Sequence, residues 1–185
     1  MAPGTHLLTS WLIGAPFLKN KKERMLVTVA GVIPDIDGAG IIIDKINMKL
    51  GEHSIYYEKY HHVICHNLLF AIIFTIATLF IAKTKRVFTA SLAFFAIHIH
   101  MVADIIGSKG PDGYQWPLTY FYPFNNEIQL TFKYQWQLSA WPNSAITIGF
   151  IVLSIFMARK LGYSPYEIIS TKFDKAIFAL FKKYF

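Results

Sequence analysis

Apolar runs that alternate with clusters of Lys and Arg constrain the fold of this chain most strongly. The second of five runs is broken by Pro34–Gly38, and the runs cover residues 7–18, 25–33, 67–82, 87–106 and 144–158. Crossing a bilayer core takes roughly 20 helical residues. The runs therefore predict membrane helices, of which the first two are too short or too interrupted to cross alone.

The composition agrees with a membrane protein. Of the 185 residues, 54% are hydrophobic and 16% are charged, whereas soluble domains are about 25% charged. A net charge of +7 in so apolar a chain favours anionic lipid as the partner over nucleic acid. Cys65 is the only cysteine, which excludes a disulfide framework. We expect one membrane-embedded, all-α domain over residues 1–185, a polytopic helical bundle over 1–160 and a tail over 161–185.

The basic clusters predict the orientation in the membrane. Runs one, three and five lead into clusters at 19–24, 83–86 and 159–160, so these clusters and the tail fall on one side. Of the 18 Lys and Arg residues, 13 lie there, and five lie opposite: Lys45, Lys49, Lys59, Lys109 and Lys133. The positive-inside rule makes the more basic side cytoplasmic. We expect a multi-pass protein of the cell (inner) membrane, with its N-terminus outside and its C-terminus in the cytoplasm.

The loop region 109–141 is aromatic and is expected on the outer side. Apolar residues alternate with polar ones at Ile128, Leu130, Phe132, Tyr134, Trp136 and Leu138. This period of two predicts a strand. Residues 123–126 would form the turn that pairs it with 119–122 in a small hairpin.

The tail has the pattern of a basic amphipathic helix. Ser164-Pro165-Tyr166-Glu167 reads as a capping box with proline at the first helical position. Apolar residues then recur at steps of three or four, with lysines between them. We expect a helix that lies on the inner leaflet or packs on the protein's own cytoplasmic face.

Ionisable residues inside membrane spans are costly and usually functional. In the predicted topology, seven of them fall at the outer ends of the apolar runs: His6, Asp35, Asp37, His61, His66, His100 and Asp104. His100 and Asp104 are four residues apart, so they share one helix face. They lie roughly 21–27 Å along a helix from Arg86, in the outer half of a bilayer core about 30 Å thick. The seven are therefore expected to converge on one cavity.

Three neighbouring residues need separate interpretation. His62 lies four residues before His66, so helical spacing favours it over His61, and both stay candidates. His98 lies two residues from His100, roughly 200° around a helix. We expect His98 to be structural, and Cys65 to be inert packing.

The candidate ligands suit a divalent cation. Imidazole and carboxylate ligands favour Zn²⁺, with Mn²⁺, Fe²⁺ and Mg²⁺ as alternatives. Seven ligands exceed what one tetrahedral ion needs, so the set could hold two ions. Such ions activate a water and stabilise a leaving oxygen, while Asp37 and Asp104 would bridge ions or accept a proton.

Taken in order, these residues resemble a family. The motifs are Thr5-His6, Gly31-Val32-Ile33-Pro34-Asp35-Ile36-Asp37, His61 to His66, His100 to Asp104, Gly107 and Trp116-Pro117. They are similar to those of small membrane-bound metal-dependent hydrolases of bacteria and archaea, which include a LexA-regulated inner-membrane member. The resemblance spans about residues 5–124. Its register favours His61 as the ligand, but His62 and Asn67 stand where the family usually has Arg and Ser.

The resemblance implies a function. It predicts an integral membrane, metal-dependent hydrolase of a phosphoester, such as a lipid headgroup near the outer leaflet. A weaker similarity links the ordered Asp and His residues to zinc-dependent phospholipase C and single-strand nucleases, which are all-helical phosphoester hydrolases. The alternative is a non-enzymatic membrane protein that binds metal, or haem through His66 and His100. Three carboxylates argue against haem, which has no use for them.

Overall fold

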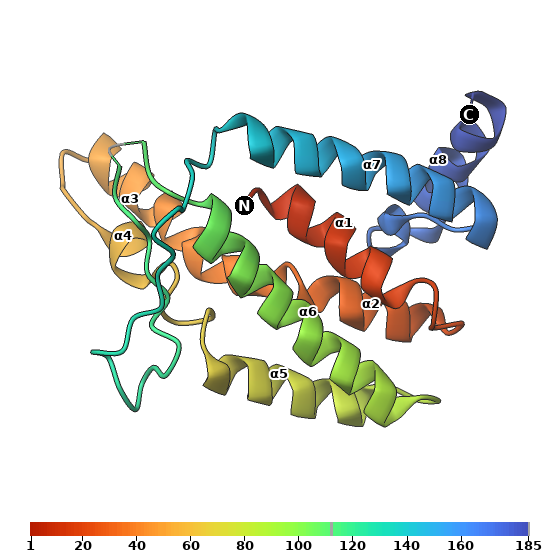
Figure 1. The fold of residues 1–185 in the computed structure, drawn as a ribbon, viewed down its shortest axis with the longest axis horizontal. Coiled ribbons are helices and arrows are strands. Elements are labelled where there is room, and N and C mark those ends of the chain that lie inside the picture. The colour runs from red at the N-terminus through yellow and green to blue at the C-terminus, as the bar shows by residue number, and fades with distance from the viewer. Residues whose placement is uncertain (112, 185) are drawn as a thin grey trace.

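The structure is a computed structural model that describes residues 1–111 and 113–184, and its longer helices run along one direction (Figure 1). The helices are α1 (Pro3–Gly14), α2 (Lys21–Ala30), η1 (Ile33–Ala39, 3₁₀), α3 (Gly40–Lys49), α4 (Tyr56–Tyr60), α5 (Leu68–Ile81), α6 (Arg86–Gly107), α7 (Trp141–Leu161), η2 (Pro165–Ile168, 3₁₀) and α8 (Thr171–Tyr184). The all-α prediction is confirmed for the described residues, which contain no strand.

Two of the described helices are long and apolar enough to cross a membrane. They are α6 and α7, with 22 and 21 residues, or about 33 Å of helix each. A third crossing is present if α2 and η1–α3, which meet at a bend of 48°, form one broken span. The expectation of about five apolar segments is therefore supported only for two or three.

The third apolar run is shorter as a helix than expected. Asn67 caps α5 by accepting a hydrogen bond from the Phe70 N–H (2.8 Å), so the helix begins after it. α5 has 14 residues, or about 21 Å, and α1 has 12. Both are shorter than a bilayer core is thick.

Small side chains let α2, α5 and α6 pack closely. Ala30, Ala71, Ala93 and Ala96 are fully buried in the main apolar cluster, together with Ile97. Alanines at helix contacts allow close approach of backbones, which is how apolar helices associate where lipid competes with every apolar contact. This packing holds α6 at the centre of the molecule, in contact with α1, α2 and α5.

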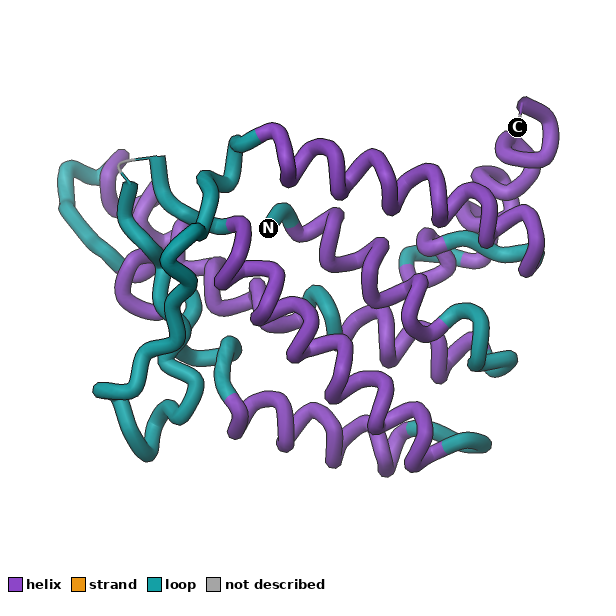
Figure 2. The backbone as a smooth tube through the Cα atoms, in the orientation of Figure 1, coloured by secondary structure: helices purple, strands orange, loops and turns teal. Residues whose placement is uncertain are grey.

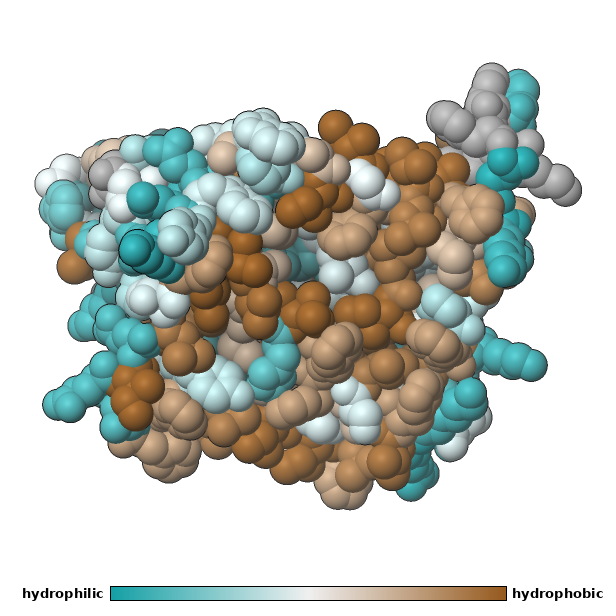
Figure 3. Space-filling model, in the orientation of Figure 1, coloured by the Kyte–Doolittle hydropathy of each residue, from teal (hydrophilic) through white to brown (hydrophobic). Residues whose placement is uncertain are grey.

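The two ends of the molecule differ. The α1–α2 and α5–α6 connections and the end of α7 lie at the end that carries α8 (Figure 1). Most of the long loops lie at the opposite end, beside α3 and α4 (Figure 2). Hydrophobic residues cover the middle of the visible face, while hydrophilic ones gather toward both ends (Figure 3). This distribution is typical of a protein surrounded by lipid at mid-height.

The predicted strand and hairpin at 119–138 are wrong. Among the described residues, one antiparallel bridge, Leu118 with Leu130, joins the two segments that were predicted to pair. The alternation is interrupted because the chain turns before Gln135, whose N–H bonds to the Phe132 carbonyl. The Gln135 side chain is buried and its amide donates to the Asp104 carbonyl (3.0 Å). The Gln135 side chain thus binds a carbonyl of the last helical turn of α6, where carbonyls lack partners within the helix. The period-two pattern did not predict this inward position of Gln135.

The capping box in the tail is confirmed only in part. Ser164 caps a helix whose first position is Pro165, but this is the short 3₁₀ helix η2, and α8 begins at Thr171. Glu167 pairs with Arg24, whose Nη2 lies 2.6 Å from Oε2. The Ser164 hydroxyl and N–H both donate to Asp174 Oδ1. Glu167 and Asp174 of the tail therefore bind buried partners, and the helix that directly follows Ser164 is a 3₁₀ turn of four residues.

Candidate metal centre

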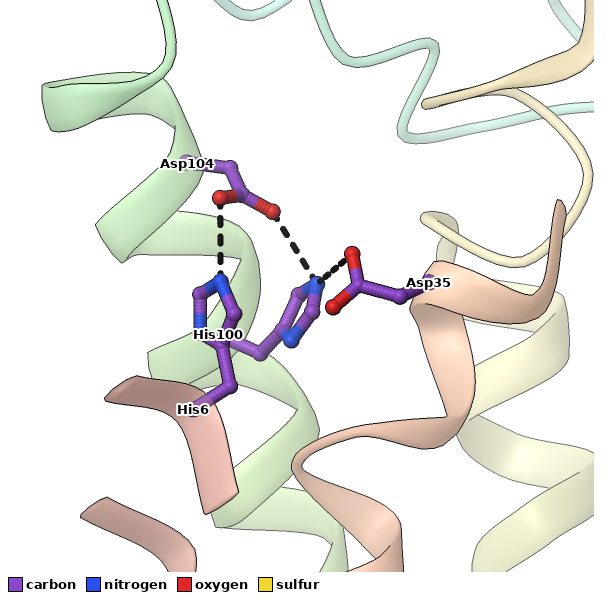
Figure 4. A group of neighbouring side chains, drawn as sticks. All are labelled: His6, Asp35, His100 and Asp104. Atoms are coloured by element: carbon purple, nitrogen blue, oxygen red, sulfur yellow. Dashed lines mark hydrogen bonds and ion pairs between the residues drawn. The ribbon is translucent and has the colours of Figure 1, made fainter. Parts of the chain in front are cut away.

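The predicted ligands come together at the ends of separate elements. His6 lies on α1, Asp35 and Asp37 lie on η1, His66 precedes α5, and His100 and Asp104 lie near the end of α6. His6, Asp35, His100 and Asp104 offer ligand atoms that all lie within 4.8 Å of one another. Figure 4 shows these four side chains pointing toward one another from three elements.

A glycine lets α1 come close enough to contribute. A Cβ at Gly31 would lie only 1.5 Å from Ser10 Oγ and 3.1 Å from the His6 carbonyl oxygen. Glycine alone permits this approach. The same Gly31 has a carbonyl that accepts a hydrogen bond from His100 Nδ1 (2.8 Å). The Gly-x-x-Pro-Asp segment therefore positions two of the histidines as well as its own carboxylates.

Four ligand atoms surround the centre of the cluster. His66 Nε2 and His100 Nε2 lie 3.0 Å apart. Asp104 Oδ2 is 3.0 Å from His100 Nε2 and 3.5 Å from His66 Nε2. Asp35 Oδ1 lies 3.6 Å and 4.0 Å from the same two nitrogens. Two histidines and two carboxylates thus converge, and both histidines are fully buried.

The hydrogen bonds around the histidines turn lone pairs inward. Because His100 Nδ1 donates to the Gly31 carbonyl, Nε2 carries the lone pair of a neutral ring. His66 Nδ1 lies 2.9 Å from Asp37 Oδ2, so the same tautomer is favoured there. His66 Nε2 and His100 Nε2 lie 3.0 Å apart, so either a proton on His66 or a bound cation must separate their lone pairs. Metal-binding histidines commonly have such a partner at the second nitrogen.

Unpaired buried atoms also fit a cation. Asp35 Oδ2 and His62 Nδ1 are buried and have no hydrogen-bond partner among the described residues, whereas Asp104 Oδ2 faces histidine nitrogens. Unpaired buried carboxylate oxygens cost free energy unless a positive charge compensates them. The other Asp104 oxygen, Oδ1, contacts the N-terminal ammonium group of Met1 and His6 Nε2 (3.2 Å). The donor set therefore fits a divalent cation.

Asp37 has a different position from Asp35. Its Oδ1 lies 2.8 Å from His61 Nδ1, and its Oδ2 also accepts a hydrogen bond from the Cys65 N–H (3.0 Å). Asp37, His61 and His66 could form a ligand group of their own, but only through the His66 nitrogen that faces Asp37. The geometry favours Asp37 as the residue that orients His66 and His61.

The structure places His61 and His62 differently. His62 is buried, and its Nε2 lies 3.8 Å from Asp104 Oδ2. Its φ of 66° lies in the left-handed region, which a residue other than glycine seldom adopts. Residues 61–67 are therefore not helical, so the helical spacing that favoured His62 over His61 does not apply here. His62 joins His66 and Asp104 in a further ligand group, while His61 contacts Asp37.

The histidine predicted to be structural lies outside the cluster. His98 Nδ1 donates to the Phe94 carbonyl (2.8 Å), and its Nε2 lies 2.9 Å from the Tyr120 hydroxyl. Both of its ring nitrogens are therefore used. Cys65 is buried, as expected for packing.

Hydrogen bonds to carboxylates govern the charge of His66. Burial lowers its pKa, but the hydrogen bonds to Asp104 and Asp37 outweigh burial and raise the pKa of His66 to about 9. Without a metal ion, this ring carries a proton at neutral pH. A metal ion bound at Nε2 would have to displace that proton.

A cavity of about 460 Å³ connects the cluster to the loop end. Its lining includes Asp35, His62 and Asp104 of the cluster, together with Tyr57, Lys109 and Trp116. Burial and nearby carboxylates raise the pKa of Tyr57, so its hydroxyl stays a donor. Sequence reasoning did not identify Tyr57 or Lys109, and no motif marked them. Trp116 stood in the motif set, but without a role.

Comparisons with known proteins identify a family. The family model described as "YdjM inner membrane protein" matches residues 1–170. No curated protein matches, and no solved structure matches.

Proposed function

Since the chain belongs to the YdjM inner membrane protein family, we propose that this inner-membrane protein is a metal-dependent hydrolase of phosphoesters. One observation carries the proposal. His66 Nε2 and His100 Nε2 lie 3.0 Å apart, and Asp104 Oδ2 and Asp35 Oδ1 lie within 4.0 Å of both nitrogens. A cavity of about 460 Å³ gives a reactant access to this group.

Zinc is the ion that the donor set favours. Neutral imidazoles and carboxylates are its usual ligands in catalytic sites, whereas Mg²⁺ prefers oxygen ligands throughout. His66, His100, Asp35 and Asp104 would hold one ion, and His6 or His62 with Asp104 would support a second. Manganese and iron remain alternatives that the same ligands accept. Once bound, the ion would supply Lewis acidity, which lowers the pKa of a water and neutralises charge on a phosphoryl oxygen.

The chain's own groups have separate parts in the reaction. Asp104 would hold the ion through Oδ2, while its Oδ1 contacts His6 Nε2 and the N-terminal ammonium group. Asp37 would act through His66, because its carboxylate contacts the outer nitrogen of that ring. Lys109 lines the cavity, where its charge would attract an anionic phosphoester.

The substrate that suits this position is a lipid phosphoester of the outer leaflet. The cluster is built from the start of α1, from η1 and from the end of α6, whereas the basic connections lie at the opposite ends of α1 and α6 (Figure 1). If that basic end is cytoplasmic, the metal ligands lie in the outer half of the membrane, near the depth of lipid headgroups.

The test combines metal analysis with hydrolysis. Protein purified in detergent should bind zinc and cleave p-nitrophenyl phosphate or its diester. Asp104→Asn should lose hydrolysis by about 10²-fold or more, and His98→Ala should retain it. Bound zinc without hydrolysis across a panel of phosphoesters and phospholipids would favour a non-enzymatic metal protein. A Soret band in place of zinc would support the haem alternative.

A further inference from the structure

A groove opens from the metal cluster toward the lipid. It has a volume of about 290 Å³ and lies between α6 and α7, with α1 as its floor. Both α6 and α7 pack on α1 but barely on one another. The two helices are therefore apart along the residues that line the groove, and if both cross the membrane, the opening between them meets lipid.

The floor of the groove is polar and belongs to the cluster. His6 and His100 line it, and both are at least 98% buried, with Thr5 and Ser10 beside them. The His6 and His100 rings are 3.8 Å apart between centroids. His6 Nε2 lies 3.2 Å from Asp104, which in turn lines the loop-side cavity. One set of ligands thus separates the groove from the cavity.

The walls of the groove are apolar. They consist of Ile99, Val102, Ala103 and Ile106 on α6, and Ile146 and Phe150 on α7. From Ile99 to Ile106 the wall is about 10 Å long, which is the length of part of one extended hydrocarbon chain. Hydrophobic residues also cover the face around this region (Figure 3).

We propose that this groove holds the hydrocarbon chain of a lipid phosphoester that enters from the bilayer. The chain would lie between α6 and α7, its phosphate would face the cation that His100 and Asp104 would hold, and the headgroup would occupy the loop-side cavity. This inference rests on the proposed function and names its substrate class. An apolar groove with a buried polar end suits an amphiphile, because a water-soluble phosphoester has nothing to place against six apolar side chains.

The test uses a long-chain alkyl phosphate with a diazirine in its chain. Protein in lipid nanodiscs is photolysed with this probe, and the labelled peptides are identified by mass spectrometry. Labels should concentrate on peptides that contain 99–106 and 146–150. Ile146→Trp, which fills the groove, should lower this labelling about tenfold, a cost near 1.4 kcal/mol.

The matched control is Leu153→Trp. Leu153 lies on the same helix, outside the groove, and is 45% exposed, so labelling should not change. Zinc content and monodisperse elution show whether each variant is folded. If both folded variants were labelled to the same extent, or if labels were spread evenly over the exposed helix faces, the proposal that the groove binds the hydrocarbon chain would be wrong.

The proposed function has its own separate failure. If the wild-type protein is labelled in the groove but neither binds zinc nor cleaves a phosphoester, the lipid-binding proposal is supported and the hydrolase proposal is wrong. If p-nitrophenyl phosphate is cleaved but the groove is not labelled, the hydrolase stands and lipid access by this route is wrong.

Discussion

At His66 and His100, the hydrogen bond made by one ring nitrogen decides what the other can do. His100 donates to a backbone carbonyl and His66 contacts Asp37, so both Nε2 atoms face the same point. Asp37 thus affects metal binding without touching the ion, whereas Asp104 would touch it. The two carboxylates should therefore differ in how much their loss costs.

We expect His100→Ala, Asp104→Asn and Asp35→Asn each to reduce bound zinc by more than about a hundredfold in affinity, because each removes a ligand. Asp37→Asn should cost about 10–100-fold, the usual effect of losing a partner of a ligating histidine. His98→Ala should change nothing, since both His98 nitrogens bind elsewhere. Mass spectrometry of metal per folded protein measures the outcome. Full zinc occupancy in both the Asp35 and Asp104 variants would contradict the proposed metal site. Loss of zinc in the His98 variant would mean that the residues of α6 are assigned to the wrong helix faces.

Cys65 should be unreactive in the folded protein. Burial, and next the charge of Asp37, raise the pKa of its thiol to about 11. Only the thiolate reacts, so at pH 8 maleimide should label Cys65 roughly a hundredfold more slowly than a cysteine with an ordinary pKa near 8.5. The rate should rise about tenfold per pH unit up to that pKa. Fast labelling in folded protein at pH 8 would contradict the buried position.

Among the elements, the tail is attached to the bundle by one buried ion pair. Arg24 of α2 donates to both carboxylate oxygens of Glu167 in η2, and to the Leu18 and Lys19 carbonyls. Its guanidinium also lies 3.6 Å above the Tyr163 ring. Arg24 and Glu167 are both buried. The pair thus connects α2, the α1–α2 turn and the tail.

Glu167→Gln should destabilise the protein, because it leaves Arg24 charged and buried without a carboxylate. Breaking one side of a buried pair costs about 3–5 kcal/mol, which should appear as a lower thermal unfolding midpoint in detergent. Glu127→Gln, in the exposed loop, is the control and should have no effect. Zinc content should stay unchanged below the unfolding temperature, since neither residue belongs to the cluster. An unchanged midpoint for Glu167→Gln would show that the pair does not hold the tail.

The elements also show where sequence reasoning succeeds and fails. The i, i+4 spacing of His100 and Asp104 placed both on one helix face, as the structure shows. The roles of Asp37 and His62 depend on a 3₁₀ turn and a left-handed residue, which no periodicity encodes. The strand prediction for 128–138 was wrong because the Gln135 side chain turns inward and binds the Asp104 carbonyl near the end of α6. Local patterns predicted helix faces, but not the contacts made between elements.

For the whole molecule, charge asymmetry predicts orientation. Three basic connections lie at the end that carries α8, and the aromatic loops lie at the other. We expect a cysteine at Asn126 to be labelled from the outside by an impermeant maleimide, and a cysteine at Lys85 only after permeabilisation. Both positions are exposed, and the native Cys65 is not expected to interfere. Labelling of Asn126→Cys only from the cytoplasmic side would reverse the topology.

The position of the ligands between a cavity and a groove affects what happens after cleavage. Asp104 borders the loop-side cavity, whereas His6 and His100 border the lipid-side groove. A lipid phosphoester cut between them would release one fragment into water and leave the other in the bilayer. The two fragments would then be diluted into different phases and could seldom meet again at the metal. Hydrolysis would become effectively one-way, and accumulation of either fragment alone would do little to reverse it.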